Sequence, residues 1–371
     1  MTKIVISSNT SWYLYNFRKN TIKALLDEGY EVITVAPHDE YVQKLTSLGT
    51  THRNIEIDQG GTNPFVDFLT FVNFYKIYRT EKPAVVLNFT PKNNIYGTLA
   101  AKFSGAKVIN NIAGLGMVFI SDGLVSNLTK FLYKISQSRA DKIFFQNEDD
   151  RNLFISEKLI NPNNTDRLPG SGVDTSRFKA SEAPDDGIVR FLLIARMLYD
   201  KGVGHYVEAA RELKLKYGHK VEFQLLGFLG VNNPSAVTES QMKKWVDEGI
   251  VTYLGTSDSV ENEIAKIDCQ VLPSFYREGV PKTLLEAGAM GKPIVTTDNV
   301  GCRETVDDGI NGFLCIPKST ESLVEKLDLI INMSHSERIR MGLNSRKKMQ
   351  RQFDELIVID KYTSSIIKLT N

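Results

Sequence analysis

Short apolar runs alternate with longer stretches of helical periodicity through the first half of the chain. The stretch from Tyr15 to Glu28, for example, gathers its apolar side chains on one face of a helix. This alternation is typical of a parallel sheet covered by helices on both faces. The predicted strands of this half are Lys3 to Ser7, Glu31 to Ala36, Ala84 to Asn88, Lys107 to Asn111 and Lys142 to Gln146.

The same alternation restarts at Val189, after a polar run with proline and glycine at 179–187 that we interpret as a linker. We therefore predict an α/β protein with two parallel-sheet domains, 1–180 and 187–352, and a terminal helix within 353–371. The predicted strands of the second half are Val189 to Ala195, Val221 to Leu226, Val251 to Leu254, Cys269 to Leu272 and Pro293 to Thr297.

Composition excludes several classes of protein. A formal net charge of +1 over 371 residues gives no strong field for nucleic acid. The three cysteines have no metal-ligand spacing, which favours packed thiols in a reducing compartment. The apolar run at the N-terminus is too short for a signal peptide, and no stretch is long enough to span a bilayer. We expect a cytoplasmic protein whose contact with a membrane is peripheral.

Two glutamates eight positions apart mark the main candidate site, Glu278 and Glu286. Pro281 fits the first turn of a helix, so Glu278 lies on the preceding loop and Glu286 within the helix. The first-turn N–H groups of Lys282 and Thr283 can bind an anion at the positive end of the helix dipole. The alternative is a capping carboxylate followed by a solvated glutamate in mid-helix.

The segment from Glu278 through Gly279, Val280 and Pro281 to Glu286 resembles the Glu-x7-Glu signature of retaining glycosyltransferases of family 4, which have the GT-B fold. The flanking Leu-Pro-Ser at 272–274 and Gly-Lys-Pro at 291–293 are also similar to that family. The resemblance implies that Glu278 contacts the donor sugar, that Glu286 contacts the ribose hydroxyls, and that 279–283 line the donor site. It also implies two Rossmann-like domains that bind acceptor (1–180) and donor (187–352), with the terminal helix returning to the first.

Arg196 and Lys201 lie five apart on a predicted strand-to-helix loop, where two cations can converge on one diphosphate. In the family, this pair neutralises the leaving phosphates; a surface salt bridge is the alternative. Gly227 can approach the nucleotide, and Gly255 with Thr256 lies where the family has its base-binding turn. No Asp-x-Asp pair is present to hold a divalent ion, so we expect no metal and no cofactor beyond a UDP-sugar co-substrate.

Three loops at predicted strand ends are candidates for the acceptor site. Asn9 lies on the first, which can equally be a helix-capping turn. Lys92 and Asn94 lie on the second, where Lys92 is otherwise a solvated loop charge. Gly114 and Gly116 lie on the third, which lacks the histidine that many family members carry there and is otherwise a tight turn. The segments Asn88 to Gly97 and Asn111 to Phe119 resemble those of enzymes that extend undecaprenyl-diphosphate-linked glycans, which implies a polyprenyl-diphosphate-linked saccharide as acceptor.

Two stretches, 64–82 and 124–142, combine helical apolar spacing with aromatic or basic side chains. Such helices pack in a core, or they lie on an anionic membrane surface. Two rival functions also stay open at this point. One is transfer to a soluble sugar or metabolite, and the other is a nucleotide-sugar-binding module without turnover.

Overall fold

The computed structural model describes residues 1–371 except 59, 62 and 116–122. The chain divides into two compact units, Met1–Ser171 with Leu356–Asn371 (unit 1) and Gly172–Glu355 (unit 2). The division precedes the polar run predicted as a linker, because the backbone of that run is tied to unit 2. The N–H of Ser181 donates to the carbonyl of Met290 at 3.1 Å.

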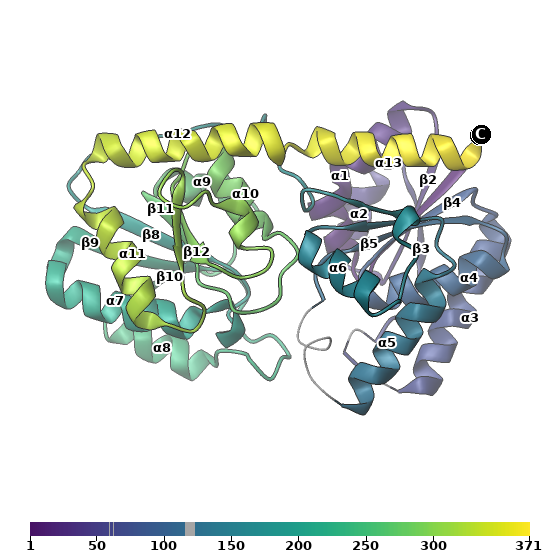
Figure 1. The fold of residues 1–371 in the computed structure, drawn as a ribbon, viewed down its shortest axis with the longest axis horizontal. Helices are drawn as coiled ribbons and strands as arrows, with labels where there is room; N and C mark the ends of the chain where they lie inside the picture. Colours follow the sequence, from purple (N-terminus) through teal and green to yellow (C-terminus); the bar gives the residue numbers. More distant parts are fainter. Residues whose placement is uncertain (59, 62, 116–122) are drawn as a thin grey trace. The chain divides into compact units, whose positions relative to one another are not determined.

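Unit 1 contains a parallel sheet in the order β3-β2-β1-β4-β5-β6-β7 (Figure 1). Apolar runs predicted all of these strands except β3 and β7. Polar residues dominate both of those, so neither shows the apolar pattern of a buried strand. The strands are β1 (Lys3–Ser7), β2 (Glu31–Ala36), β3 (Thr51–Asn54), β4 (Val85–Phe89), β5 (Lys107–Ile112), β6 (Lys142–Phe145) and β7 (Thr165–Arg167).

The helices of unit 1 form two layers over this sheet. The core of one layer includes side chains of α1 (Ser11–Asp27), α2 (Tyr41–Thr46) and α13 (Glu355–Thr370). Tyr362 and Ile366 of α13 are fully buried there, so the predicted return of the terminal helix to the first domain is confirmed. The other layer consists of α3 (Pro64–Glu81), the π-helical turn η1 (Asn93–Gly97), α4 (Thr98–Phe103), α5 (Leu124–Gln137) and α6 (Glu148–Ser156).

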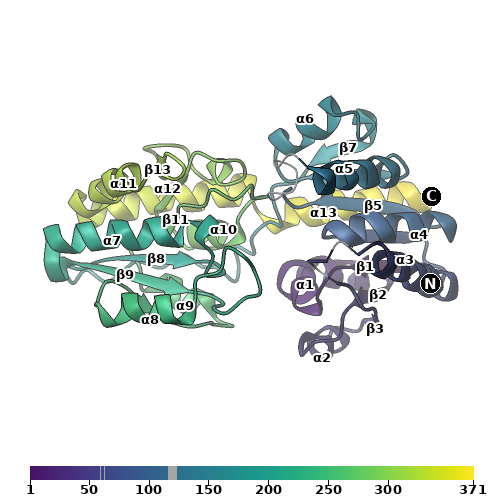
Figure 2. The same ribbon diagram turned by 90° about the horizontal axis from the view of Figure 1, so that it is seen from below.

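Unit 2 contains a second parallel sheet, in the order β10-β9-β8-β11-β12-β13. Figure 2 shows α7 and α8 on opposite sides of β8 and β9. After a turn at 309–311, Gly312 begins β13 and pairs with Ile294 of β12. The strands are β8 (Val189–Ile194), β9 (Val221–Leu226), β10 (Thr252–Tyr253), β11 (Cys269–Leu272), β12 (Ile294–Thr297) and β13 (Gly312–Cys315).

The helices of unit 2 lie between these parallel strands or after the last of them. They are α7 (Val203–Tyr217), α8 (Glu239–Asp247), α9 (Val260–Ala265), α10 (Lys282–Ala289), α11 (Thr320–Asn332) and α12 (His335–Gln352). Short 3₁₀ turns lie at η2 (Pro162–Asn164) in unit 1 and at η3 (Tyr199–Lys201), η4 (Gly218–Lys220) and η5 (Arg303–Thr305) in unit 2. None of the helices that the structure describes is long and apolar enough to cross a membrane.

The strand order reverses once in each sheet, between β1 and β4 in unit 1 and between β8 and β11 in unit 2. Ligands of doubly wound sheets bind at the carboxyl ends of the strands beside this reversal. The loops after β8 and β11 carry Arg196, Lys201 and Glu278. The fold therefore directs attention to those two loops.

Candidate active site

A buried ion pair joins the two loops that leave the point of reversal in unit 2. Lys201, at the end of η3, donates to Oε1 of Glu278 on the loop after β11. The two side chains are 13% and 11% exposed. The hydroxyl of Ser274 also donates to Glu278, at 2.9 Å. The ammonium of Lys201 lies 4.7 Å from the centre of the Tyr276 ring, so the pair has an aromatic neighbour as well.

Two glycines allow the chain to approach closely around this pair. Gly202 follows Lys201 with φ of 80°, and a Cβ there would lie 2.1 Å from the carbonyl oxygen of Pro273. Gly301 has φ of 81°, and a Cβ there would lie 1.8 Å from the carbonyl oxygen of Gly279. A side chain at either position would clash with backbone in a conformation that other residues rarely adopt.

The backbone of Asp200 links the same two loops. Its carbonyl accepts the N–H groups of Phe275 at 3.0 Å and Tyr276 at 3.1 Å. Oδ1 of Asp200 is buried without a hydrogen-bond partner in the described structure. Burial raises the pKa of Asp200, and the nearby Lys201 opposes that rise. The candidate site therefore holds a second acidic group beside Glu278.

Arg196 differs from Lys201 in its surroundings. Its side chain is exposed and makes no ion pair with any residue that the structure describes. The structure thus brings Lys201 to Glu278 and leaves the Arg196 guanidinium at the surface near them. A diphosphate bound beside this pair would lie near the ammonium of Lys201, which the ion pair holds in place, and near the exposed guanidinium of Arg196.

Glu286 is buried in α10, so the alternative of a solvated glutamate in mid-helix is wrong. The ammonium of Lys282 lies 3.9 Å from its carboxylate. Burial raises the pKa of Glu286, while the cations of Lys282 and Arg177 oppose the rise. Arg177 pairs with Glu261 at 2.9 Å, which joins the start of unit 2 to α9 beside this carboxylate.

The N-terminus of α10 lies between the two glutamates. Pro281 occupies the N-cap position, one residue before the first turn in which the sequence placed it. Its carbonyl accepts the N–H of Leu284 at 3.1 Å, while the N–H of Thr283 has no acceptor among the described residues. The N–H of Thr283 and the helix dipole make this terminus a suitable place for a phosphate.

Two further predicted residues meet at the neighbouring strand ends. The N–H of Gly227, after β9, donates to the carbonyl of Gly255, after β10, at 2.7 Å. Tyr253 donates its hydroxyl to the carbonyl of Gly227 at 2.8 Å. Thr256 follows with an exposed side chain. The predicted donor residues therefore lie along one edge of the unit 2 sheet, at the carboxyl ends of β8, β9, β10 and β11.

In unit 1, the candidate acceptor residues have different surroundings. Lys92 pairs with Asp67 of α3 at 2.5 Å and is mostly buried, so it is not a solvated loop charge. Tyr96 donates to the same carboxylate at 2.9 Å. The side chain of Asn94 is enclosed and donates to the carbonyl of Asn111 at 2.8 Å. The side chain of Asn94 therefore supports the interior of unit 1, and its contact with an acceptor stays a prediction.

The first and third loops agree in part with the alternatives given for them, a helix-capping turn and a tight turn. Thr10 caps α1 by accepting the N–H of Tyr13 at 3.0 Å, so this helix begins at Ser11 and the capping turn is confirmed. Asn9 precedes it and is partly exposed. Gly114 has φ of 97° and is also partly exposed. Gly116 lies outside the described residues.

Sequence reasoning missed several residues of the site. Ser274 was visible only as part of the Leu-Pro-Ser run, and nothing local indicated that its hydroxyl would orient Glu278. The pair of Arg177 and Glu261 joins positions 84 residues apart, which no spacing rule detects. Tyr276 likewise takes its place beside Lys201 only through the fold.

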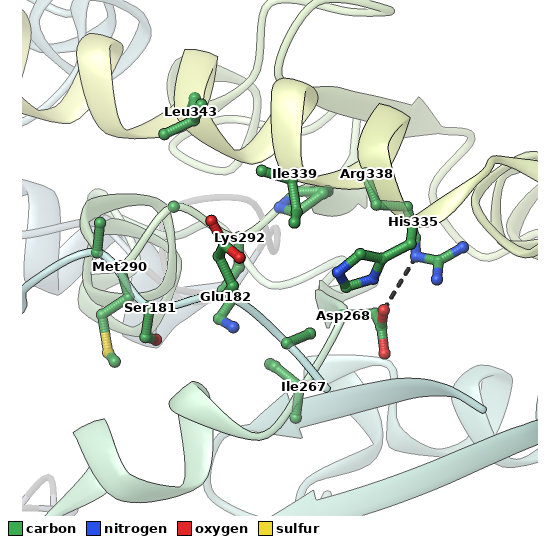
Figure 3. Close-up of a pocket in the computed structure, with 14 residues that line it drawn as sticks. Ser181, Glu182, Ile267, Asp268, Met290, Lys292, His335, Arg338, Ile339 and Leu343 are labelled. Carbon is green, nitrogen blue, oxygen red and sulfur yellow. Dashed lines mark hydrogen bonds and ion pairs between the residues drawn. The ribbon is translucent and has the colours of Figure 1, made fainter. Parts of the chain in front are cut away.

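A separate cavity of about 140 Å³ lies at the opposite edge of the unit 2 sheet, before β11 and β12 (Figure 3). Its lining includes Asp268, which accepts from Arg338 at 2.9 Å, and Lys292, which donates to the carbonyl of Ala265 at 3.0 Å. These charged groups are thus already bonded within the fold. Among residues 1–58, 60–61, 63–115 and 123–371, no cluster of three or more His, Cys, Asp or Glu side chains could hold a metal ion.

Comparison with known proteins gives the same assignment for both units. A family model described as glycosyl transferases group 1 matches residues 174–348, and one described as glycosyl transferase 4-like matches 3–147. A Campylobacter jejuni protein named N,N'-diacetylbacillosaminyl-diphospho-undecaprenol alpha-1,3-N-acetylgalactosaminyltransferase is 32% identical, over 97% of each chain. The chain belongs to the family 4 glycosyltransferases. It is a retaining hexosyltransferase with the GT-B fold.

More distant relatives agree with this assignment. An Escherichia coli protein named UDP-Gal:alpha-D-GlcNAc-diphosphoundecaprenol alpha-1,3-galactosyltransferase is 23% identical to this glycosyltransferase, over 80% of this chain and 78% of its own. The solved structure of Anabaena HepE in complex with UDP has a TM-score of 0.78 at 16% identity, over 99% of this chain and all of its own. That structural likeness shows the fold.

The buried pair of Lys201 and Glu278 makes the first prediction. We expect Lys201→Met to lower kcat/KM by about 10², the effect of losing one preorganised stabiliser of developing charge. The variant should also lose about 3–5 kcal/mol of unfolding free energy, because the Glu278 carboxylate stays buried without its partner. Steady-state kinetics and denaturant unfolding measure the two effects.

The double variant Lys201→Met/Glu278→Gln separates stability from catalysis. It removes both charges, so the unfolding free energy should largely return while activity stays low. Lys243→Met is the matched control, because its pair with Asp247 has exposed partners and should contribute about 0–1 kcal/mol. Wild-type kcat/KM in Lys201→Met would show that this lysine does not act on the leaving group.

The raised pKa of Glu286 makes the second prediction. The folded protein holds this proton more tightly than the unfolded chain, so ionised Glu286 costs stability as the pH rises through its folded-state pKa. Glu286→Gln should therefore be more stable than the wild type at pH 8, with a difference that shrinks toward pH 4. Thermal unfolding across this range measures it.

The same Glu286→Gln variant should bind UDP more weakly, because an amide accepts hydrogen bonds from the ribose less well than a carboxylate. Glu208→Gln on α7 is the control, since that carboxylate is largely exposed. A pH-independent stability difference together with unchanged UDP affinity would remove Glu286 from the donor site.

Proposed function

We propose that this enzyme transfers a hexose or an N-acetylhexosamine from a UDP-sugar to a polyprenyl-diphosphate-linked saccharide during bacterial surface-glycan or glycoprotein-glycan assembly. The observation that carries the proposal is the 32% identity, over 97% of both chains, to a transferase named for a diphospho-undecaprenol acceptor. The E. coli relative is named for an acceptor of the same class. A UDP donor has further support from the UDP bound to the structural neighbour HepE.

In this proposal, unit 2 binds the donor. Arg196, Lys201 and the N-terminus of α10 at Lys282 and Thr283 stabilise the negative charge that grows on the diphosphate as the bond to the sugar breaks. Glu278 positions the sugar, and Ser274 holds Glu278 in place. The acceptor oxygen bonds to the anomeric carbon with retention of configuration, and UDP leaves.

The nucleoside is held by the groups on either side of the diphosphate. Glu286 accepts hydrogen bonds from the ribose hydroxyls, and Gly255 with Thr256 contacts the base. Gly227 packs directly against the Gly255 turn, which supports its place beside the nucleotide. Gly279 and Val280 connect Glu278 to the anion site at Pro281 and α10. A shift of this segment would therefore move the groups that contact the sugar and those that contact the diphosphate.

Unit 1 binds the acceptor in this proposal. Asn9, Lys92 and Gly114 lie on loops after β1, β4 and β5, which are neighbours in the sheet. Lys92 would contact the acceptor while it stays bound to Asp67, or by exchanging that carboxylate for a phosphate. Gly116 stays in the proposal from its position in the sequence alone. An acceptor with a polyprenyl tail remains in the bilayer, so we place the enzyme peripherally on the anionic cytoplasmic face of the membrane.

An assay of UDP release tests the proposed reaction. UDP-hexoses and UDP-N-acetylhexosamines are each supplied with a polyprenyl-diphosphate-linked saccharide or with soluble sugars. We expect release with one donor class and only with the lipid-linked acceptor. Equal turnover with soluble sugars would favour the metabolite-acceptor alternative, and donor binding without release from any pair would favour a non-catalytic binding module.

Metal independence is the second part of the proposal, because Lys201 and Arg196 supply the positive charge that a divalent ion would otherwise bring to the diphosphate. Dialysis against EDTA should leave the rate of UDP release unchanged. The control is the same sample with Mg²⁺ or Mn²⁺ added back. A loss of rate that either metal reverses would show that the diphosphate is held by an ion.

A further inference from the structure

Two helices of unit 1, α3 and α5, each expose several large apolar side chains. On α5, the buried face includes the polar Ser126, Ser136 and Gln137, and Gln137 donates to the carbonyl of Asn94 at 2.8 Å. Large apolar side chains of α5 lie on the outer face. On α3, Phe74 and Tyr78 in the C-terminal half enter the core, while the apolar side chains of the first turns do not. The exposed set, which we call the outer apolar surface, is Phe65 (67%), Phe68 (59%), Leu69 (44%), Val125 (51%), Leu128 (49%) and Phe131 (57%).

These side chains come from the same face of the sheet. Phe74 of α3 and Tyr133 of α5 share one core cluster with η1 and α4, so both helices belong to one layer (Figure 1). The exposed residues occupy the N-terminal part of each helix. Soluble proteins rarely expose several large apolar side chains on adjacent elements without a partner. The outer apolar surface therefore requires an occupant.

The position of the outer apolar surface connects it to the acceptor loops. Lys92 follows β4 directly and pairs with Asp67 in the first turn of α3. The N-terminus of α3 thus lies at the carboxyl end of the unit 1 sheet. α5 follows β5 and runs back along the sheet, so it also begins at that end. An occupant of the outer apolar surface would lie beside the loops that carry Asn9, Lys92 and Gly114.

The charges around the outer apolar surface favour an anionic occupant. The sequence of α5 contains Lys130 and Lys134 and no acidic residue. Lys130 pairs with Glu157 at 3.1 Å in an exposed ion pair that is worth little, and Lys134 is exposed. Asp67 on α3 is already neutralised by Lys92. Lys142, the last residue of the stretch predicted as a basic helix, instead begins β6 and is not part of the outer apolar surface.

We propose that the outer apolar surface is the membrane-docking surface of this enzyme, with the first turns of α3 and α5 inserted at the headgroup level of an anionic leaflet. The inference rests on the proposed lipid-linked acceptor and specifies how the enzyme reaches it. Phe65, Phe68, Val125 and Leu128 enter the boundary between headgroups and acyl chains. Lys134 remains among the anionic headgroups. This orientation presents the carboxyl end of the unit 1 sheet to a diphosphate whose tail stays in the bilayer.

Flotation of the full chain with vesicles tests the surface. The wild type should bind vesicles that contain phosphatidylglycerol more strongly than vesicles of phosphatidylcholine alone, and added salt should weaken that binding. Phe68→Asp and Leu128→Asp, one on each helix, should each reduce binding at least tenfold. Lys134→Glu should weaken binding only to the anionic vesicles. Leu215→Asp is the matched control, because Leu215 is 86% exposed on α7 of unit 2.

Wild-type vesicle binding in both aspartate variants, or no binding by the wild type, would overturn the proposal. Sedimentation provides a second readout. A wild-type dimer that dissociates in Leu128→Asp, without any vesicle binding, would assign the surface to a second copy of the chain and also overturn it. Thermal unfolding confirms that each variant is folded.

An activity arm separates this inference from the proposed function. Phe68→Asp and Leu128→Asp should turn over a short-tailed, water-soluble acceptor diphosphate at the wild-type rate, and should lose at least tenfold on acceptor embedded in vesicles. Vesicle binding without turnover of any acceptor would refute the proposed function and leave the docking surface standing. Equal rates on embedded acceptor in the variants and the wild type would refute the docking surface alone.

Discussion

The ion pair between Lys201 and Glu278 is the interaction on which the proposed donor site depends. Removing two charges from water costs several kcal/mol per ion, and mutual attraction recovers this only with good geometry and additional hydrogen bonds. Ser274 donates one such bond to Glu278. The carbonyl of Asp200 holds the two loops together by accepting the N–H groups of Phe275 and Tyr276. The glycines at 202 and 301 let the backbones approach closely enough to enclose the pair. Residues spread between β8 and η5 thus enclose or orient this one lysine and one carboxylate.

The strand order reverses once in each unit, but the side chains at the two reversals differ in chemistry. At the reversal in unit 2, two loops enclose an ion pair, Lys201 with Glu278. At the reversal in unit 1, the carboxyl ends of β1, β4 and β5 meet in a buried network of neutral groups, in which Asn88 donates to Asn110 at 3.0 Å and accepts from Ser7 at 2.7 Å. Neutral amides satisfy the interior without the desolvation cost of ions. Thr90 follows with φ of 79°, a strained conformation for a β-branched residue and one that is concentrated at functional sites.

The sequence predicted what depends on local pattern. Buried parallel strands are continuous apolar runs, so β1, β2, β9 and β11 have the predicted bounds. The short edge strands β3 and β7 lack such runs, and β13 was not among the predicted strands. The Glu-x7-Glu motif identified Glu278 and Glu286 as candidates. A single predicted helix start was enough to place one of them on the loop and the other within the helix.

Pairings between distant positions could not be predicted in this way. Lys201 and Glu278 are 77 residues apart, and Lys92 and Asp67 are 25 apart. Helical periodicity showed that 124–142 is amphipathic, but it could not tell which side faces the core. The polar partners of Gln137, on η1 and β5, settle that question. Local patterns thus predict helices and strands, whereas the partner of a charged side chain is known only from the fold.

Hydrogen–deuterium exchange with and without UDP tests the central claim most directly, because it reports where the nucleotide binds along the whole chain. If UDP binds at the reversal between β8 and β11, its addition should slow exchange at 196–202, at 254–258 and at 279–283, the N-terminus of α10. Protection confined to unit 1, or unchanged exchange at all three segments with UDP at saturation, would contradict the account.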